Sequence, residues 1–215
     1  MGKNTLLTLL GIVTFFFLSD CVMTGSPDTS DPLPPGSVAR SDVSREVSPD
    51  VPDDQIEELV RGNNRFALSL YGRIRGAEGN LFYSPFSISL ALAMTYAGAQ
   101  GETERQIADA LVFTLPQDRL HRAFNALDQR LEPPETQSGG AFVLRIANAV
   151  WGQGGYPFRD PYLDTLARNY GAGIRLMSFV RAPEESRQTI NTWVSEQTEG
   201  KIPQLLPQGS IDSLT

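Results

Sequence analysis

The sequence predicts one mixed α+β domain, preceded by an export segment and a linker. Two observations indicate this fold class. The run from Ile88 to Ala97 is apolar on all sides, which is typical of a helix buried inside a sizeable domain. The stretches Ala141–Trp151 and Ile174–Phe179 have the alternating or apolar pattern of strands, and an amphipathic helical stretch separates them. Strands separated by helices indicate a mixed fold rather than a helical bundle.

The first 21 residues have the composition of an export signal. Lys3 supplies a positive start, and the apolar stretch from Thr5 to Leu18 suits a signal-peptide core better than a membrane span. It ends in LSDC (18–21), which resembles a bacterial lipobox, although Asp20 replaces the usual small residue. We expect lipidation of Cys21; an ordinary export signal with an incidental cysteine is the alternative. Either way the protein is expected in the extracellular space or anchored on the cell envelope.

Residues 22–52 are predicted to be a disordered linker. The segment is rich in proline, serine and aspartate, and it carries few large apolar side chains. Such a composition cannot bury enough apolar surface to offset the entropy lost on folding. The folded domain is therefore expected over residues 53–215.

Within the domain, apolar spacing, capping residues and glycines define the elements in order. Pro85 interrupts a short strand, and Ser84 and Ser87 can cap the helix that follows it. Thr103 and Gln106 have the spacing of a capping box. The predicted helices are 53–76, 88–97, 103–111, 116–132, 158–170 and 182–198, and the predicted strands are 81–83, 141–151 and 174–179.

The residue inventory argues against an enzyme and against any cofactor. His121 is the one histidine, and we place it on the surface of an amphipathic helix; Cys21 is the one cysteine and lies in the export segment. A nucleophilic triad needs a histidine base beside a nucleophile, and a surface position of His121 argues against one. His/Cys metal sites are excluded by the counts. The net charge of −7 argues against nucleic-acid binding. Acidic and basic residues balance over 117–132, so no electrostatic glycosaminoglycan site is expected there.

Two spaced motifs resemble those of the serpins, the serine protease inhibitor family. The first has Asn80, Ser84-Pro85, Ser87-Ile88 and then the glycine-bounded corner Gly98-Ala99-x-Gly101-x-Thr103. The second runs from Ile190 to Val194 and continues over Thr198-Glu199-Gly200-Lys201-Ile202. Their order and spacing match the family from Ile56 to Thr215. The resemblance implies the N-terminal half of a serpin fold, in which helices surround part of a large central sheet.

The resemblance also implies roles for particular residues. Ser84 and Ser87 would line the region where the sheet opens, the alternative being a purely local cap and turn. Asn191 and Trp193 would lie on a helix in front of the sheet, and Thr198 and Gly200 would form its hinge to the next strand, the alternative being a plain helix end. The family's reactive centre is not expected in this chain.

The resemblance also implies a mechanism, in which a serine or cysteine protease cleaves an exposed loop of the inhibitor. The loop then inserts into the sheet as an added strand and traps the protease as an acyl-enzyme. We expect a full-length protein to inhibit in this way, and this chain to be an inactive fragment of it. The alternative is a non-inhibitory serpin that acts as a binding, chaperone or surface-interaction module. An anchor on the membrane through Cys21 would add a second partner.

Overall fold

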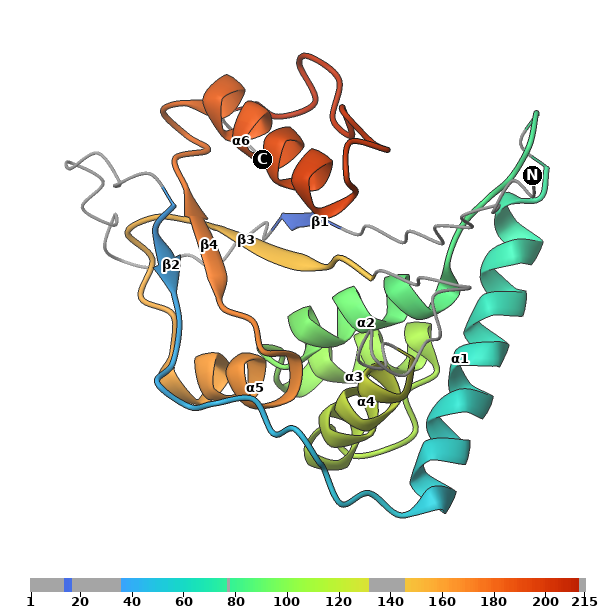
Figure 1. The fold of residues 1–215 in the computed structure, drawn as a ribbon. Helices are drawn as coiled ribbons and strands as arrows, with labels where there is room; N and C mark the ends of the chain where they lie inside the picture. The colour runs from blue at the N-terminus through green and yellow to red at the C-terminus, as the bar shows by residue number, and fades with distance from the viewer. Residues whose placement is uncertain (1–13, 17–35, 77, 132–145, 213–215) are drawn as a thin grey trace, which may run out of the picture.

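The computed structural model describes residues 14–16, 36–76, 78–131 and 146–212. Figure 1 shows a small sheet with α6 on one side of it and the other helices on the opposite side. The helices are α1 (Asp53–Ile74), α2 (Pro85–Tyr96), α3 (Gly101–Leu111), α4 (Gln117–Leu131), α5 (Asp160–Tyr170) and α6 (Pro183–Gln197). The strands are β1 (Thr14–Phe16), β2 (Val38–Ala39), β3 (Ala149–Gln153) and β4 (Ile174–Met177).

The sheet has the strand order β1-β3-β4-β2. β3 and β4 are parallel, with Val150 opposite Ile174, and α5 forms the crossover between them. β1 runs parallel to the other edge of β3, although its residues belong to the expected export segment. β2 runs antiparallel to the outer edge of β4. The prediction of strands separated by a helix is confirmed for β3 and β4; the part of the expected strand before residue 146 lies outside the described residues.

β3 is buried on both of its faces, because two layers of helices cover it. Trp151 points towards α6 and packs with Ile190. Val150 points the other way and packs with Met94 of α2 and Leu166 of α5. Alternate residues of one strand therefore belong to two separate hydrophobic clusters, as the two-residue period of a strand requires.

Gly152 lies where the strand passes closest to the α5 side. A Cβ atom at this position would lie 2.7 Å from Cζ of Phe158 and 2.8 Å from Cγ2 of Ile174. No side chain fits in that space, so β3 carries its largest side chain, Trp151, directly before a position that accepts none.

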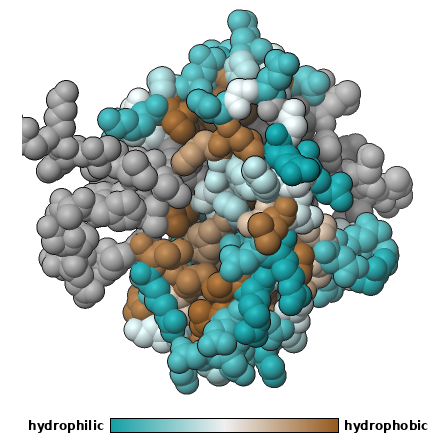
Figure 2. All heavy atoms as spheres, turned by 90° about the vertical axis from the view of Figure 1, so that its right-hand side faces the viewer, coloured by the Kyte–Doolittle hydropathy of each residue, from teal (hydrophilic) through white to brown (hydrophobic). Residues whose placement is uncertain are grey.

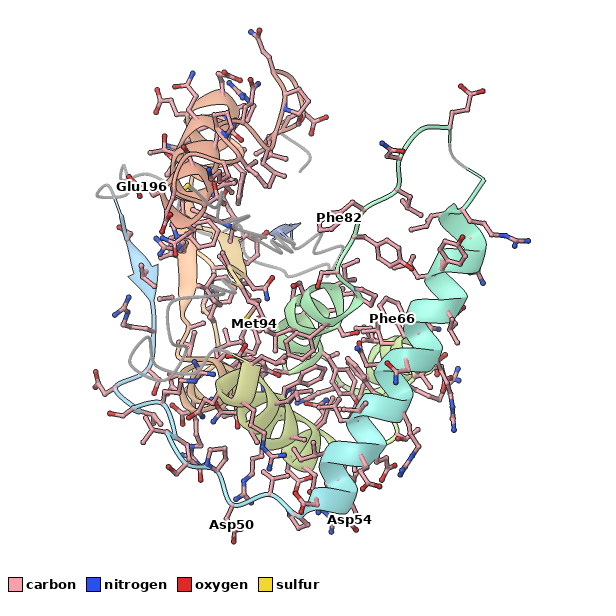
Figure 3. All side chains as sticks on the ribbon, turned by 45° about the vertical axis from the view of Figure 1, so that its right-hand side comes forward. Asp50, Asp54, Phe66, Phe82, Met94 and Glu196 are labelled. Carbon is pink, nitrogen blue, oxygen red and sulfur yellow. The ribbon has the colours of Figure 1, made fainter. Side chains whose placement is uncertain are left out.

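A third hydrophobic cluster fills the space between α1, α2, α3 and α4. Phe124 of α4 is fully buried at its centre, and its ring meets that of Phe113 edge-on at a centroid distance of 5.7 Å. Phe66 of α1 is buried as well, and Figure 3 shows it on the side of α1 that faces the other helices. The apolar helix predicted around residues 88–97 is confirmed as α2, which contributes fully buried residues such as Ala93.

The predicted capping box at Thr103 and Gln106 is wrong. α3 begins two residues earlier, at Gly101, and no side chain caps its first turn. Gln106 instead donates a hydrogen bond from Nε2 to the Glu102 carboxylate at 2.7 Å. Gly101 has a φ of +62°, and its conformational freedom lets the chain enter the helix directly from the preceding turn.

The segment predicted as a strand at 81–83 is extended but pairs with no strand in the described part of the chain. The Tyr83 hydroxyl donates to the backbone oxygen of Ala67 at 3.2 Å and fastens the segment to α1. Leu81 and Phe82 are exposed, as is Leu68 of α1. Figure 2 views the α1 side of the molecule and shows hydrophobic residues reaching its surface.

The described part of the expected linker, residues 36–52, differs from a disordered segment. β2 pairs with β4, and Arg45 forms a salt bridge with Asp128 of α4 at 2.6 Å. The composition argument considered only apolar burial, whereas these contacts are made by backbone groups and a charged side chain. Among the described residues, no helix combines the length and the apolar character that crossing a membrane requires.

Candidate functional site

Two tryptophans and an arginine hold α6 against the front of the sheet. The rings of Trp151 on β3 and Trp193 on α6 meet edge-on, with centroids 5.7 Å apart. The guanidinium carbon of Arg175 on β4 lies 5.5 Å from the Trp151 ring centroid and 5.2 Å from that of Trp193. A cation that contacts two aromatic rings contributes roughly 1–2 kcal/mol for each partly desolvated contact. Trp193, predicted to lie on the front helix, is therefore placed there and helps to fasten it.

The charged form of Arg175 is disfavoured in this position. Burial lowers its pKa, the positive charge of Arg40 lowers it further, and the negative charge of Glu196 opposes both effects. Figure 3 shows Glu196 at the same end of the molecule as the strands that carry this group. Sequence reasoning missed Arg175; its signal was one charged residue between Ile174 and Leu176 in an otherwise apolar strand.

Asn191 on α6 holds the chain that follows the helix. Its Oδ1 accepts hydrogen bonds from the backbone N–H groups of Leu205 (2.9 Å) and Leu206 (2.8 Å), and its Nδ2 donates to the Leu206 carbonyl at 2.9 Å. Arg187 donates to that same carbonyl from Nη1 at 2.6 Å. The segment after α6 is thus tied back along the helix instead of extending away from it.

Thr198 and Gly200 form the end of α6. Thr198 Oγ1 accepts from the N–H of Ile202 at 3.0 Å and donates to the Ser195 carbonyl at 3.3 Å. Gly200 has a φ of +74°, and its N–H donates to the Ser195 carbonyl at 2.8 Å. Glu199, directly after Thr198, also lies in the left-handed region with a φ of +51°, and its N–H donates to the Glu196 carbonyl at 3.2 Å, so Glu199 and Gly200 together end the helix. These hydrogen bonds of Thr198 and Gly200 are those of a capped helix end, and their role as a hinge stays a prediction.

Ser84 and Ser87 lie at the start of α2, on the opposite side of the sheet from α6. Ser84 is the N-cap residue: its Oγ accepts from the Ser87 N–H at 3.3 Å, and it lies 3.0 Å from the Ser87 hydroxyl. Ser87 is 1% exposed, whereas Ser84 is only half-buried. The described structure places Asn191 and Trp193 on α6 and Thr198 and Gly200 in the turn directly after it, and it does not bring the two serines to them.

His121 is not at the surface, and the prediction that placed it there is wrong. It is 2% exposed between α4 and α5, and its Nδ1 lies 2.6 Å from the Tyr170 hydroxyl. Burial lowers its pKa to about 4, and the charge of Asp118 opposes that shift. Cys21 lies outside the described residues. Among the residues that the structure describes, no three His, Cys, Asp or Glu side chains are grouped as metal ligands.

A shallow pocket of about 240 Å³ lies on α1, away from the sheet. It is lined by Glu58, Arg61, Arg65 and Thr114, and also by Gly62. Arg61 already forms an ion pair with Glu57 at 3.3 Å, and both side chains are exposed. The front of the sheet, with α6 across it, is therefore the better defined of the two candidate sites.

Comparisons with known proteins show the family to which the chain belongs. The family model described as serpin (serine protease inhibitor) matches residues 61–215. The chain is 42% identical over 162 residues to the leukocyte elastase inhibitor of pig (Sus scrofa), covering 74% of this chain and 42% of that protein. It is 37% identical to the human (Homo sapiens) protein of the same name over 162 residues, covering 74% of this chain and 41% of that protein.

Solved structures give the same result. A serpin from Arabidopsis in its native stressed conformation superposes with a TM-score of 0.64 and 25% identity, covering 75% of this chain and 41% of that one. The thermophilic serpin tengpin in its native state superposes with a TM-score of 0.61 and 27% identity, covering 79% of this chain and 40% of that one. The chain thus spans about two fifths of the length of the relatives that it matches. Serpins are a family of protease inhibitors rather than enzymes, and the chain, with the partial serpin fold described above, belongs to this family.

Proposed function

We propose that this chain forms part of an inhibitor of a serine protease of the elastase type. The single observation that supports this target is the 42% identity to a protein named leukocyte elastase inhibitor. The proposal extends to the whole protein, because the chain spans two fifths of that relative. A cysteine protease, the other target class expected from the sequence, has no such support among these relatives.

The proposed mechanism is conformational trapping, in which a cleaved loop enters the sheet as a new strand. The construction of the sheet supports it. α6 is held across the front of β3 and β4 by side chains, among them the Trp151–Arg175–Trp193 group and the buried Ile190 and Val194, and such contacts can separate and re-form without breaking a strand ladder. Ser84 and Ser87 would line the region where the sheet opens, at its back, where α2 packs on β3.

The proposal is tested by titration with a neutrophil-type elastase. A full-length protein containing this chain should form a 1:1 complex that survives denaturing electrophoresis, since an acyl-enzyme is covalent. The 215-residue chain by itself should form none. A full-length protein that is cleaved without forming a complex would refute inhibition and favour the alternative of a binding or chaperone serpin. A covalent complex with the 215-residue chain would refute the prediction that it is inactive.

We also propose that the protein is exported and anchored on the bacterial cell envelope through a lipid on Cys21. The apolar run before the single cysteine of the chain supports this. Growth with radiolabelled palmitate should label the wild-type protein, and Cys21→Ser should abolish the label without changing the fold. An unlabelled wild-type protein recovered from the medium would leave an ordinary export signal as the explanation.

A further inference from the structure

Residues 37–50, here called the strap, cross three elements of the domain. The strap starts as β2 beside β4, passes beneath α5 and reaches the start of α1, as Figure 1 shows in blue. The match to the serpin family begins only at residue 61, so the strap lies outside the matched region. Its contacts with the domain therefore need an explanation of their own.

The first end of the strap covers the outer edge of the sheet. Val38 and Ala39 lie opposite Arg175 and Ile174, and the Ser37 carbonyl accepts a hydrogen bond from the Leu176 N–H at 2.9 Å. This ladder satisfies backbone groups that an uncovered edge strand would leave open to pairing with other chains.

The domain accommodates this end closely at one glycine. A Cβ atom at Gly173 would lie 2.7 Å from the Ala39 carbonyl oxygen and 2.9 Å from Cγ1 of Val38. The absence of a side chain at position 173 lets the two backbones approach, so the surface of the domain matches the path of the strap.

The centre of the strap is an arginine anchor. Arg45 donates from Nε to Asn125 Oδ1 at 3.0 Å and from Nη2 to Asp128 Oδ2 at 2.6 Å. Asn125 is completely buried, and the Asp128 side chain is 14% exposed, so the guanidinium enters a partly desolvated polar site on α4. A Cβ atom on Gly171 would lie 3.0 Å from Cδ of Arg45, so the stem of the arginine passes over this second glycine.

The residue after the anchor is bound through its backbone. The Glu46 N–H donates to the Arg168 carbonyl of α5 at 2.9 Å. Its carbonyl accepts from Asn125 Nδ2 at 2.8 Å and from Gln129 Nε2 at 2.9 Å, both on α4. Backbone hydrogen bonds of this kind hold an extended peptide without depending on its neighbouring side chains. The side chain of the next residue, Val47, is accordingly 76% exposed.

We propose that α4, α5 and the edge of β4 form a binding site for an extended, arginine-centred peptide, and that its occupant is the chain's own strap. The strap is a detachable intramolecular ligand whose release would open the edge of β4 and the polar site at Asn125 and Asp128. The proposal concerns this surface alone and does not depend on protease inhibition.

The test restores the strap as a separate peptide. In the full chain, residues 37–50 are replaced by a glycine–serine segment of the same length, and a fluorescent peptide of residues 36–51 is added. We expect saturable 1:1 binding, with affinity at least tenfold weaker for the Arg45→Ala peptide. The Arg40→Ala peptide is the matched control: it loses the same charge, and its affinity should not fall, because Arg40 is exposed and its charge repels Arg175.

Amide hydrogen exchange on the otherwise unmodified chain gives a second measurement. Arg45→Ala should accelerate exchange at Glu46 and Leu176 at least tenfold, whereas Arg40→Ala should not, and α2 should stay protected in both. Equal binding of the two variant peptides, or equal exchange in the two variant chains, would overturn the proposal. A strap-replaced chain that fails to fold would also overturn it, because the strap would then be an integral part of the fold.

Discussion

Protonation of the single histidine should destabilise the fold as the pH falls below neutral. His121 is 2% exposed, its Nδ1 faces the Tyr170 hydroxyl, and its ring also lies near Tyr96, with centroids 6.1 Å apart. Its buried Nε2 has no hydrogen-bond partner among the described residues. Burial lowers the pKa of the imidazole from 6.5 to about 4, while Asp118 opposes the shift.

The sign follows from which state takes up the proton first. The folded pKa lies below the unfolded one, so the unfolded chain protonates first as the pH falls. The stabilising effect is complete above pH 6.5 and is lost progressively towards pH 4. A pKa difference of about 2.5 corresponds to about 3 kcal/mol over the whole range, of which roughly 1.3 kcal/mol is lost between pH 7.5 and 5.5.

Two measurements check this prediction. Because His121 is the one histidine in the sequence, its imidazole Cε1 proton gives a single NMR signal that should not titrate between pH 8 and 5.5. Urea unfolding at pH 7.5 and 5.5 should show the loss of stability, and His121→Gln should remove most of that difference. An imidazole that titrates near pH 6.5 in the folded protein would refute the argument from burial.

Three further substitutions test contacts described above, each by urea unfolding. Ser84→Ala removes the N-cap of α2 and should cost about 1 kcal/mol, whereas Ser84→Asn should keep most of it; equal losses would count against a capping role. Asn191→Ala leaves the N–H groups of Leu205 and Leu206 without partners and should cost about 2–3 kcal/mol. Amide exchange at these two residues should become faster, and unchanged exchange would contradict the proposed role of Asn191. Gly152→Ala should lower the free energy of unfolding by about 1–3 kcal/mol through overpacking. Its control Gly72→Ala, in an open helical position, should raise the free energy of unfolding by up to about 1 kcal/mol. An unchanged stability of Gly152→Ala would mean that its neighbours can move aside.

Features set by neighbouring residues could be predicted from the sequence. The apolar run around α2, its cap at Ser84 and the helix end at Gly200 all depend on side chains within a few positions of each other. The parallel pair β3 and β4 could be predicted as well, because a helix between two strands needs a crossover. Even among these local features, the start of α3 was predicted wrongly from Thr103, because the turn at Gly101 lets the helix begin before the capping motif.

Features that depend on distant partners could not be predicted. His121 sits on a helix with charged neighbours and has the local pattern of a surface residue; it is buried because α5 brings Tyr170 to it. Arg45 lies in a segment of linker composition, and its partners on α4 are some eighty positions away. Arg175 became interpretable only when two tryptophans from separate elements met around it.

The alternation of large and absent side chains along β3 also protects the sheet against mispairing. A slip of one residue exchanges the two faces of a strand and would carry Trp151 into the space beside Phe158 and Ile174 that excludes even a methyl group at Gly152. The same slip would put Val150 in the place of Trp151 on the α6 side, where Trp193 would lose its ring contact. Misregistered sheets are therefore penalised on both faces at once.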